Sequence, residues 1–311
     1  MLRRRARTAL LLAALSVVLG GCGLGAGSTQ DDPVTVTVTR DFGSHVVQER
    51  TASKLPSSET VMRLLQRGAN VSTRYGGGFV QCVDRLCGGS RVDWFYFVDG
   101  VEAGKGAAGT TVHGGDRVWW DLRDWRGAQR VPAVVGSFPE PFLHGPGTDK
   151  RLPVRIECAA VSSPACSAVE KVLVHYGIPA AKGTLNSSFT RDTLRVLVGP
   201  WKQVRVDPAA VALEDGPQAS GVFAEPRPDG TAIALLDARG RAVRSLGAGG
   251  GLVAATRAGE DQPVWTVTGT DEAGVQAAAA AFSQAGLRNR FAVAAATGAA
   301  PLGLPLGAGA R

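Results

Sequence analysis

The stretch DWFYFVDG, residues 93–100, and the stretch RVWWDLRDW, residues 117–125, decide the fold of the N-terminal part of this chain. Together they hold five of its nine tryptophan and tyrosine residues. The side chains of the first stretch alternate with the period-two pattern of a β-strand. Trp94, Tyr96 and Val98 face one way, and Phe95 and Phe97 face the other. Asp99–Gly100 is a turn dipeptide that favours a tight hairpin. The sequence therefore predicts two neighbouring aromatic strands.

The adjacent residues Trp119 and Trp120 point to opposite faces of the second strand. A single sheet with a helix on one side cannot bury both rings against that helix. One ring therefore needs another partner: solvent, a partner protein, a second domain or a ligand. Trp125 follows among charged residues, as is typical of recognition surfaces. We take five residues as candidate ligand-binding residues: Trp119, Trp120, Trp125, Tyr96 and Asp99. Packing in a core or against a second domain is the alternative role for these rings.

Elements that precede these strands complete an α+β domain over residues 34–145. PVTVTVTRD, residues 33–41, alternates valine and threonine as a half-buried strand does. SSETVMRLLQRG, residues 57–68, has a serine for a cap and an apolar stripe at helical spacing. TRYGGGFVQCVDRLCGG, residues 73–89, predicts a glycine-rich turn, a strand and a hairpin. One helix on a small mixed sheet, in a β-grasp-like arrangement, accounts for this order.

The run from 93 to 125 resembles a domain family related to the C-terminal β-domain of transcobalamin and intrinsic factor. The shared parts are an aromatic strand ending in a turn, a small-residue loop, a Gly-Asp turn and a tryptophan-bearing strand. The matching residues are Trp94, Tyr96, Val98, Asp99, Gly100, Gly115, Asp116, Val118, Trp119 and Trp120. The resemblance covers residues 34–130. It implies a ligand-binding module with a corrinoid as the leading candidate ligand, although this sequence has no counterpart of the helical domain that completes the clamp of the vitamin carriers.

The first residues predict export and lipid anchoring. Residues 1–21 have an arginine-rich start, a short apolar run and small residues, which is the layout of a signal peptide. LGGC, residues 19–22, resembles the lipobox of bacterial lipoproteins, which implies cleavage before Cys22 and a diacylglyceryl group on its thiol. Residues 22–33 are small and polar, so we expect a flexible tether. The predicted location is the outer face of the bacterial cytoplasmic membrane, where lipid chains hold the protein.

The other four cysteines predict two disulfides. Four cysteines allow three pairings, but the spacing favours the local pairs Cys82–Cys87 and Cys158–Cys166. Export to an oxidising compartment agrees with disulfide formation. Neither pair has the C-x2-C spacing of a zinc site, so we expect no metal.

Residues 146–296 predict a second, small α/β-type layered domain. Strand patterns alternate in part with helical patterns that begin near Ser163, Asp207 and Asp271. The stretch 136–153 holds four prolines and is a candidate link between the two domains. We expect residues 297–311 to form a disordered tail.

Net charge and the absence of known motifs argue against a nucleic-acid-binding protein and against an enzyme. The formal net charge is +7, and removal of the four arginines in residues 1–21 leaves about +3, which is too mild to favour a nucleic-acid partner. The serine, cysteine and zinc hydrolase motifs are absent from the sequence, and we expect neither an enzyme nor a cofactor. The aromatic segment offers candidates for a carboxylate pair of the kind used in sugar hydrolysis, namely Asp93, Asp116, Asp121 and Asp124, although aspartate is also common at turns.

The sequence favours a ligand-binding lipoprotein that serves an uptake system. Its expected partners are the membrane, through the lipid anchor, and an uptake transporter or a helical partner protein. Two other hypotheses stay open: a protein-interaction scaffold of the cell envelope, and a binder of cell-wall glycans, because tryptophan rings stack on sugars.

Overall fold

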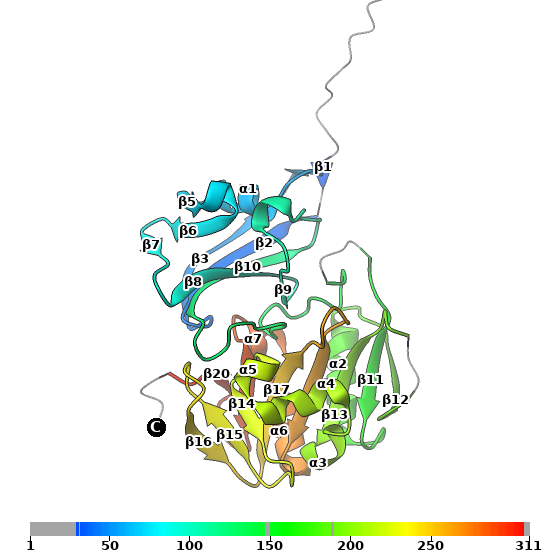
Figure 1. Cartoon of the computed structure of the whole chain (residues 1–311). Helices are drawn as coiled ribbons and strands as arrows, with labels where there is room; N and C mark the ends of the chain where they lie inside the picture. The colour runs from blue at the N-terminus through cyan, green and yellow to red at the C-terminus, as the bar shows by residue number, and fades with distance from the viewer. Residues whose placement is uncertain (1–28, 31, 147–149, 188–189, 308–311) are drawn as a thin grey trace, which may run out of the picture.

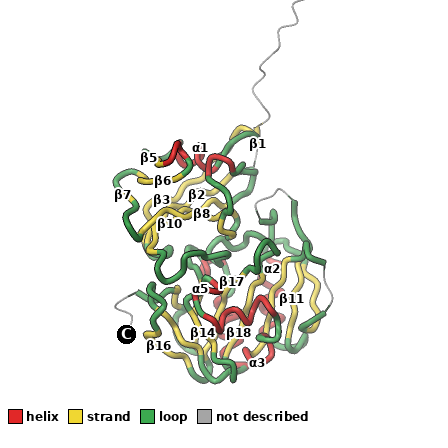
Figure 2. The backbone as a smooth tube through the Cα atoms, in the orientation of Figure 1, coloured by secondary structure: helices red, strands yellow, loops and turns green. Residues whose placement is uncertain are grey.

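The computed structural model is a strand-rich mixed α/β structure with several sheets (Figures 1 and 2). It describes residues 29–30, 32–146, 150–187 and 190–307. The predicted signal peptide, Cys22 and most of the predicted tether lie outside the described residues. In the described part of the chain, no helix is long and apolar enough to cross a membrane.

The N-terminal unit is built on a five-stranded mixed sheet. Its strands, in spatial order, are β3 (His45–Ala52), β2 (Val34–Arg40), β10 (Arg117–Asp124), β8 (Val92–Val98) and β9 (Val101–Glu102). The central pair, β2 and β10, is parallel, and the other neighbours are antiparallel. Both predicted aromatic strands are therefore present, and Trp120 of β10 lies opposite Tyr96 of β8.

A second, smaller layer covers one face of this sheet. It consists of α1 (Val61–Gln66) and a three-stranded sheet of β5 (Val71–Arg74), β6 (Phe79–Val83) and β7 (Leu86–Cys87). The helix begins at Thr60, whose hydroxyl accepts a hydrogen bond from the Arg63 amide. Short 3₁₀ turns, η1 (Tyr75–Gly77) and η2 (Ala107–Gly109), complete the layer. Residues facing it include Trp94, Tyr96 and Trp120, which form a core with the valines of β2 and the leucines of α1.

The other unit is built on a seven-stranded mixed sheet. Its spatial order is β12 (Ala180–Thr184), β11 (Val154–Cys158), β13 (Leu194–Pro200), β18 (Val264–Gly269), β17 (Gly250–Thr256), β19 (Ala292–Ala296) and β20 (Leu302–Leu304). The first four strands are parallel, and the last three add antiparallel pairs. The central strands are apolar on both faces, as expected for a sheet covered on both sides.

Helices cover one face of the seven-stranded sheet, and a mixed layer covers the other (Figure 1). On the first face lie α2 (Pro164–His175) and α6 (Glu272–Ala281), with α7 (Gln284–Leu287) following. The mixed layer contains α3 (Trp201–Val204), α4 (Pro208–Val211), η3 (Ala212–Asp215), α5 (Pro217–Ser220) and a three-stranded sheet of β14 (Ala224–Pro226), β15 (Ile233–Leu236) and β16 (Ala242–Leu246). The side chains of Ser163, Asp207 and Asp271 cap α2, α4 and α6 at the positions that the sequence predicts.

An aromatic cluster joins the two units. The rings of Phe97 and Trp119, on the face of the N-terminal sheet opposite α1, lie 5.5 Å and 5.2 Å from the ring of Phe291, which precedes β19. Phe42 adds edge contacts to Phe291 and Phe223. Both faces of the aromatic strands are thus buried, one by the helix layer and one by the second unit.

The candidate link of residues 136–153 is not an exposed connection between two domains, because its first part is buried. Residues 131–142 are almost entirely buried, and Phe138 and Phe142 pack beside Trp265 in the core of the seven-stranded sheet. This segment lies within the expected N-terminal domain of residues 34–145 but packs with the second unit. Proline content predicted an irregular backbone here, and that backbone occupies the interior.

Both of the predicted flexible ends contain a short strand in the structure. Residues 302–304 of the predicted disordered tail form β20, and Leu304 and Leu306 are buried in the core. Leu302–Leu304 pairs with the open edge of β19. At the other end, Thr29–Gln30 of the predicted tether forms strand β1, which pairs with β4 (Leu55–Pro56). An available strand edge orders each segment through backbone hydrogen bonds.

Candidate ligand-binding site

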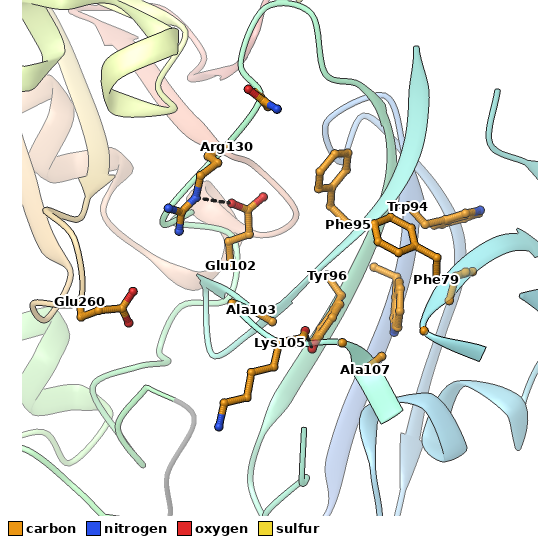
Figure 3. A pocket seen from close by; sticks show the side chains of 16 residues that line it. Phe79, Trp94, Phe95, Tyr96, Glu102, Ala103, Lys105, Ala107, Arg130 and Glu260 are labelled. Carbon is orange, nitrogen blue, oxygen red and sulfur yellow. Dashed lines mark hydrogen bonds and ion pairs between the residues drawn. The ribbon is translucent and has the colours of Figure 1, made fainter. Parts of the chain in front are cut away.

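A cavity of about 540 Å³ opens beside strand β8, between the five-stranded sheet, the β5–β6 turn and the loop after β9. Five aromatic side chains line it: Phe79, Trp94, Phe95, Tyr96 and Trp120. Four charged side chains complete the lining: Glu102, Lys105, Arg130 and Glu260. Figure 3 shows Glu102, Arg130 and Glu260 across the cavity from Tyr96 and Phe79. Its volume is in the range of small-molecule sites, which hold about 300–1,000 Å³.

Strands β8 and β10 place two stacked rings in the lining. Tyr96 and Trp120 face each other across the antiparallel pair, with ring centroids 4.8 Å apart. Both side chains are more than nine-tenths buried. The indole Nε1 of Trp120 is buried and has no hydrogen-bond partner among the described residues, which is uncommon for a buried donor. This wall is therefore flat and apolar, with one unused donor.

The loop from Val101 to Gly109 forms a second wall. It is rich in alanine and glycine, so its backbone lies close to the rings. The Tyr96 hydroxyl donates a 2.6 Å hydrogen bond to the Lys105 carbonyl and shares a 2.8 Å hydrogen bond with the Thr110 hydroxyl. Burial raises the pKa of Tyr96, so its hydroxyl stays protonated as the donor. Tyr96 thus both lines the cavity and holds the loop in place.

The rim carries two exposed aromatic rings at the β5–β6 turn. Tyr75 is 84% exposed and Phe79 is 56% exposed, and their rings meet edge to face at 6.2 Å. Gly76 and Gly77 between them have positive φ angles, which glycine adopts without steric cost. The Cys82–Cys87 disulfide joins β6 to β7 in the hairpin that follows. The β5–β6 turn therefore presents two rings to solvent beside the cavity.

The carboxylate of Glu102, in the lining, is paired with a buried arginine. Glu102 accepts a 2.8 Å hydrogen bond from the buried guanidinium of Arg123 and a 3.2 Å one from the Val131 amide. Burial raises the pKa of Glu102, although Arg123 opposes that shift. The Arg123 guanidinium in turn lies 3.9 Å from the ring centroid of Phe95, a cation–π distance. The Arg123–Glu102 pair therefore fixes Phe95 and leaves little free negative charge on Glu102.

Two of the five predicted residues, Tyr96 and Trp120, line this cavity. Trp119 instead lies in the aromatic cluster between the units, and its indole donates a 2.8 Å hydrogen bond to Thr39. Trp125 donates to the Asp93 carboxylate at 3.0 Å. Asp99 is buried in the turn after β8, where its carboxylate accepts a hydrogen bond from the Arg117 amide.

Sequence reasoning missed Phe79 and Lys105 as site residues. Phe79 follows three glycines on a short strand, and Tyr75 precedes them, so two rings flank a turn where an apolar core residue is not expected. The position of these two rings at a turn was the signal in the sequence that could have identified Phe79 as a site residue. Lys105 is a lone charge in a run of alanine and glycine, and its closeness to the aromatic strands depends on how the loop folds back.

The four aspartates considered as a carboxylate pair each have a local role. Asp121 is fully buried and accepts hydrogen bonds from the Phe42 and Gly43 amides. Asp124 pairs with Arg126, Asp93 accepts from Trp125, and Asp116 accepts from the His113 amide. None of the four lines the cavity.

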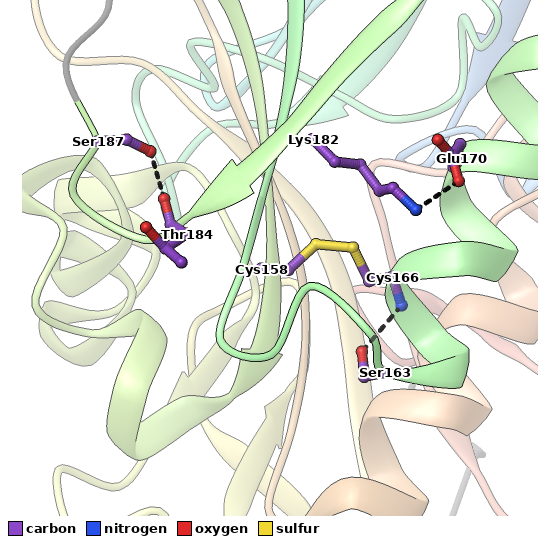
Figure 4. Close-up of a disulfide and its surroundings, with 7 residues drawn as sticks. All are labelled: Cys158, Ser163, Cys166, Glu170, Lys182, Thr184 and Ser187. Atoms are coloured by element: carbon purple, nitrogen blue, oxygen red, sulfur yellow. Dashed lines mark hydrogen bonds and ion pairs between the residues drawn. A yellow bond between two sulfur atoms is a disulfide. The ribbon is translucent and has the colours of Figure 1, made fainter.

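Both predicted cysteine pairs are disulfide-bonded in the structure. Cys158–Cys166 joins the end of β11 to the first turn of α2, where the Ser163 hydroxyl accepts a hydrogen bond from the Cys166 amide (Figure 4). Within the described ranges, no group of three or more histidine, cysteine, aspartate or glutamate side chains is arranged to hold a metal ion.

Residues 58–124 match a family described as a domain of unknown function, DUF4430. This range contains the whole aromatic wall and Lys105, but neither Arg130 nor Glu260. No curated protein sequence matches the chain.

Two solved structures are similar to part of the chain. One is described as a candidate metal-binding protein from Ruminococcus gnavus, with 18% identity, a TM-score of 0.25 and coverage of 30% of this chain and 98% of that one. The other is haptocorrin in complex with Cbi, with 17% identity, a TM-score of 0.24 and coverage of 30% of this chain and 26% of that one. The chain thus spans about a quarter of haptocorrin's length.

Proposed function

We propose that this protein is a ligand-binding lipoprotein on the outer face of the cytoplasmic membrane, and that the aromatic cavity beside β8 is its binding site. The observation that carries the proposal is the gathering of five aromatic side chains from three segments around one open cavity. Buried aromatic walls with a few polar groups are typical of small-molecule sites. The role assigned to the cavity is binding without chemical conversion.

The ligand that fits this wall has a flat, largely apolar body. Tyr96 and Trp120 offer stacking surface inside, and Phe79 extends it at the rim. A corrinoid is the first ligand to test, because the aromatic strands of this sequence resemble those of the cobalamin carriers.

The finer structural and cellular assignments belong to the same proposal. The order β3-β2-β10-β8, with its parallel central pair and a helix on one face, supports a β-grasp-like class for the N-terminal unit. The export and lipobox patterns of residues 1–22 support lipid attachment at Cys22. A membrane-held binding module would then pass its ligand to an uptake transporter or complete its site with a helical partner protein.

Fluorescence titration of the mature protein with cobalamin tests this function. We expect quenching of the tryptophans at micromolar ligand, and Phe79→Ala should weaken binding about tenfold because stacking area is lost. Val174→Ala, at an exposed valine of α2, is the control and should bind normally. Absence of quenching at tens of micromolar, with other tetrapyrroles equally silent, would overturn the corrinoid assignment.

The exposed rim favours a second candidate function. Tyr75 and Phe79 present aromatic surface to solvent, which suits stacking on a glycan or insertion into a partner protein. Binding of the protein to purified cell-wall material supports the glycan function if Tyr75→Ala abolishes it. Loss of a co-purifying envelope protein from the same variant, with no small-ligand signal, supports the scaffold.

A further inference from the structure

A second cavity of about 630 Å³ lies next to the aromatic one. The two share the loop residues Glu102 to Lys105 and also share Glu260, from the segment between β17 and β18 of the second unit. The second cavity is more polar and is lined by Thr110, Thr111, Arg257 and Gln262, among others. A single ligand with an apolar part and a polar part can therefore extend from one cavity to the other around Lys105.

The charges at this junction leave one cation without a partner. Glu102 is held by Arg123, and Glu260 lies 3.4 Å from Arg257. Arg257 also donates to the carbonyls of Asp261 and Glu260, so its guanidinium is already occupied. No ion pair or side-chain hydrogen bond joins Lys105 to any other residue in the described part of the chain. Arg130, 3.9 Å from Glu102 and 66% exposed, adds positive charge on the same side.

The aromatic wall has an unused donor as well. Trp120 is 2% exposed, and its indole N–H has no acceptor among the described residues. Neighbouring atoms cover this donor, so Trp120 offers the cavity its ring and not its N–H. Lys105 is therefore the group that favours a ligand with oxygen acceptors.

We propose that the ligand of this site carries an anionic group, a carboxylate, phosphate or sulfonate, that binds Lys105 between the two cavities and faces the Arg257–Gln262 segment of the second unit. This inference rests on the proposed function and adds the charge of the ligand to it. The apolar body of the ligand lies on Tyr96 and Trp120, and the anion lies at the polar edge. Lys105 then determines specificity, and the second unit forms the far side of the site.

A matched pair of fluorescent probes tests the assignment. Anilinonaphthalene sulfonate and phenylnaphthylamine share one aromatic framework, and only the first carries an anion. We expect Lys105→Met, which keeps the aliphatic stem, to weaken binding of the sulfonate about three- to tenfold and to leave phenylnaphthylamine unchanged. Added salt should weaken sulfonate binding to the wild type and have much less effect on Lys105→Met. Lys171→Met, on α2, is the matched control.

A variant on the far side tests the contribution of the second unit. Glu260→Gln removes an exposed negative charge near the proposed anion, so sulfonate binding should tighten about twofold while phenylnaphthylamine binding stays the same. Unchanged sulfonate affinity in this variant would contradict the position given to the anion.

The outcomes separate this inference from the function on which it rests. If both probes bind and Phe79→Ala weakens both, the cavity is a ligand site. Equal effects of Lys105→Met on the two probes would then overturn only the anionic class. If neither probe binds, or if Phe79→Ala changes neither affinity, the proposed site fails and the anion assignment fails with it.

Discussion

At the scale of single residues, Asp116 is the clearest case of a group whose charge opposes the fold. It is fully buried at the turn before β10, and its carboxylate accepts a 2.8 Å hydrogen bond from the His113 amide. Burial raises its pKa from 3.8 to about 6, and the negative charge of Glu140 adds to the shift. The His113 amide and ring and a hydrogen bond with Asp99 oppose it. His144, which pairs with Glu140, packs against the adjacent Gly115.

The raised pKa of Asp116 predicts a pH dependence of stability. Because the folded-state pKa exceeds the unfolded value, neutral Asp116 stabilises the fold fully below pH 3.8, and this contribution is lost as the pH rises through about 6. Asp116→Asn keeps a neutral side chain, so it should gain stability relative to the wild type between pH 4 and pH 7, by up to about 3 kcal/mol. Urea unfolding at each pH measures the difference. For the exposed Asp192→Asn we expect a stability that changes with pH in parallel with that of the wild type. The same parallel course for Asp116→Asn would contradict the role given to Asp116.

At the scale of elements, the loop from Val101 to Gly109 depends on one hydroxyl. Tyr96→Phe removes the hydrogen bonds to Lys105 and Thr110 but keeps the ring. We expect a stability loss of about 1 kcal/mol and faster hydrogen exchange of the amides from 104 to 110. Probe affinity should fall severalfold, because the loop wall loosens. Tyr176→Phe, which removes a hydrogen bond to Gln284 in the second unit, should leave exchange in the loop unchanged.

Strand β20 lies in a segment whose composition predicted disorder. Leu304 is buried against the core, and Leu302 of the same strand is half-buried. Leu304→Ala should therefore lower the free energy of unfolding by about 2–5 kcal/mol, and Leu302→Ala by clearly less. Chemical denaturation of the two variants gives the comparison. Equal, small losses would mean that residues 302–304 contribute little to the core.

These elements show what the sequence could and could not predict. The run of aromatic and apolar residues from 94 to 98, which ends at an Asp-Gly turn, predicted β8, and strand geometry assigns its side chains to two faces. Strands β12 and β16 were missed, since exposed edge strands carry no such pattern. In the site, Tyr96 and Trp120 follow from strand periodicity. Phe79, Lys105 and Glu260 meet them only through turns and through contacts between distant segments, which local patterns do not encode.

At the scale of the whole molecule, the two units share one interior. Trp119 and Phe97 of the first unit lie in the same apolar cluster as Phe291 and Phe223 of the second. The backbones approach closely there, since a side chain at Gly43 would collide with the Asn289 carbonyl and with Trp119. The sequence reasoning that one of two adjacent tryptophans needs a partner beyond its own helix layer is consistent with this interface. Because residues of the first unit and Glu260 of the second unit line the same cavity, the packing of the two units also sets the geometry of the proposed site.

This shared interior predicts a single cooperative unfolding transition for the wild type. Phe291→Ala removes ring contacts to Phe42, Phe97 and Trp119 together, and a buried phenylalanine contributes about 3–5 kcal/mol. The units should then unfold separately, so scanning calorimetry should show two transitions, or a calorimetric enthalpy above the van't Hoff enthalpy. Val47→Ala, at an exposed residue of β3, should keep one transition. If Phe291→Ala only lowers the melting temperature of a single transition, the units are coupled by contacts other than this cluster.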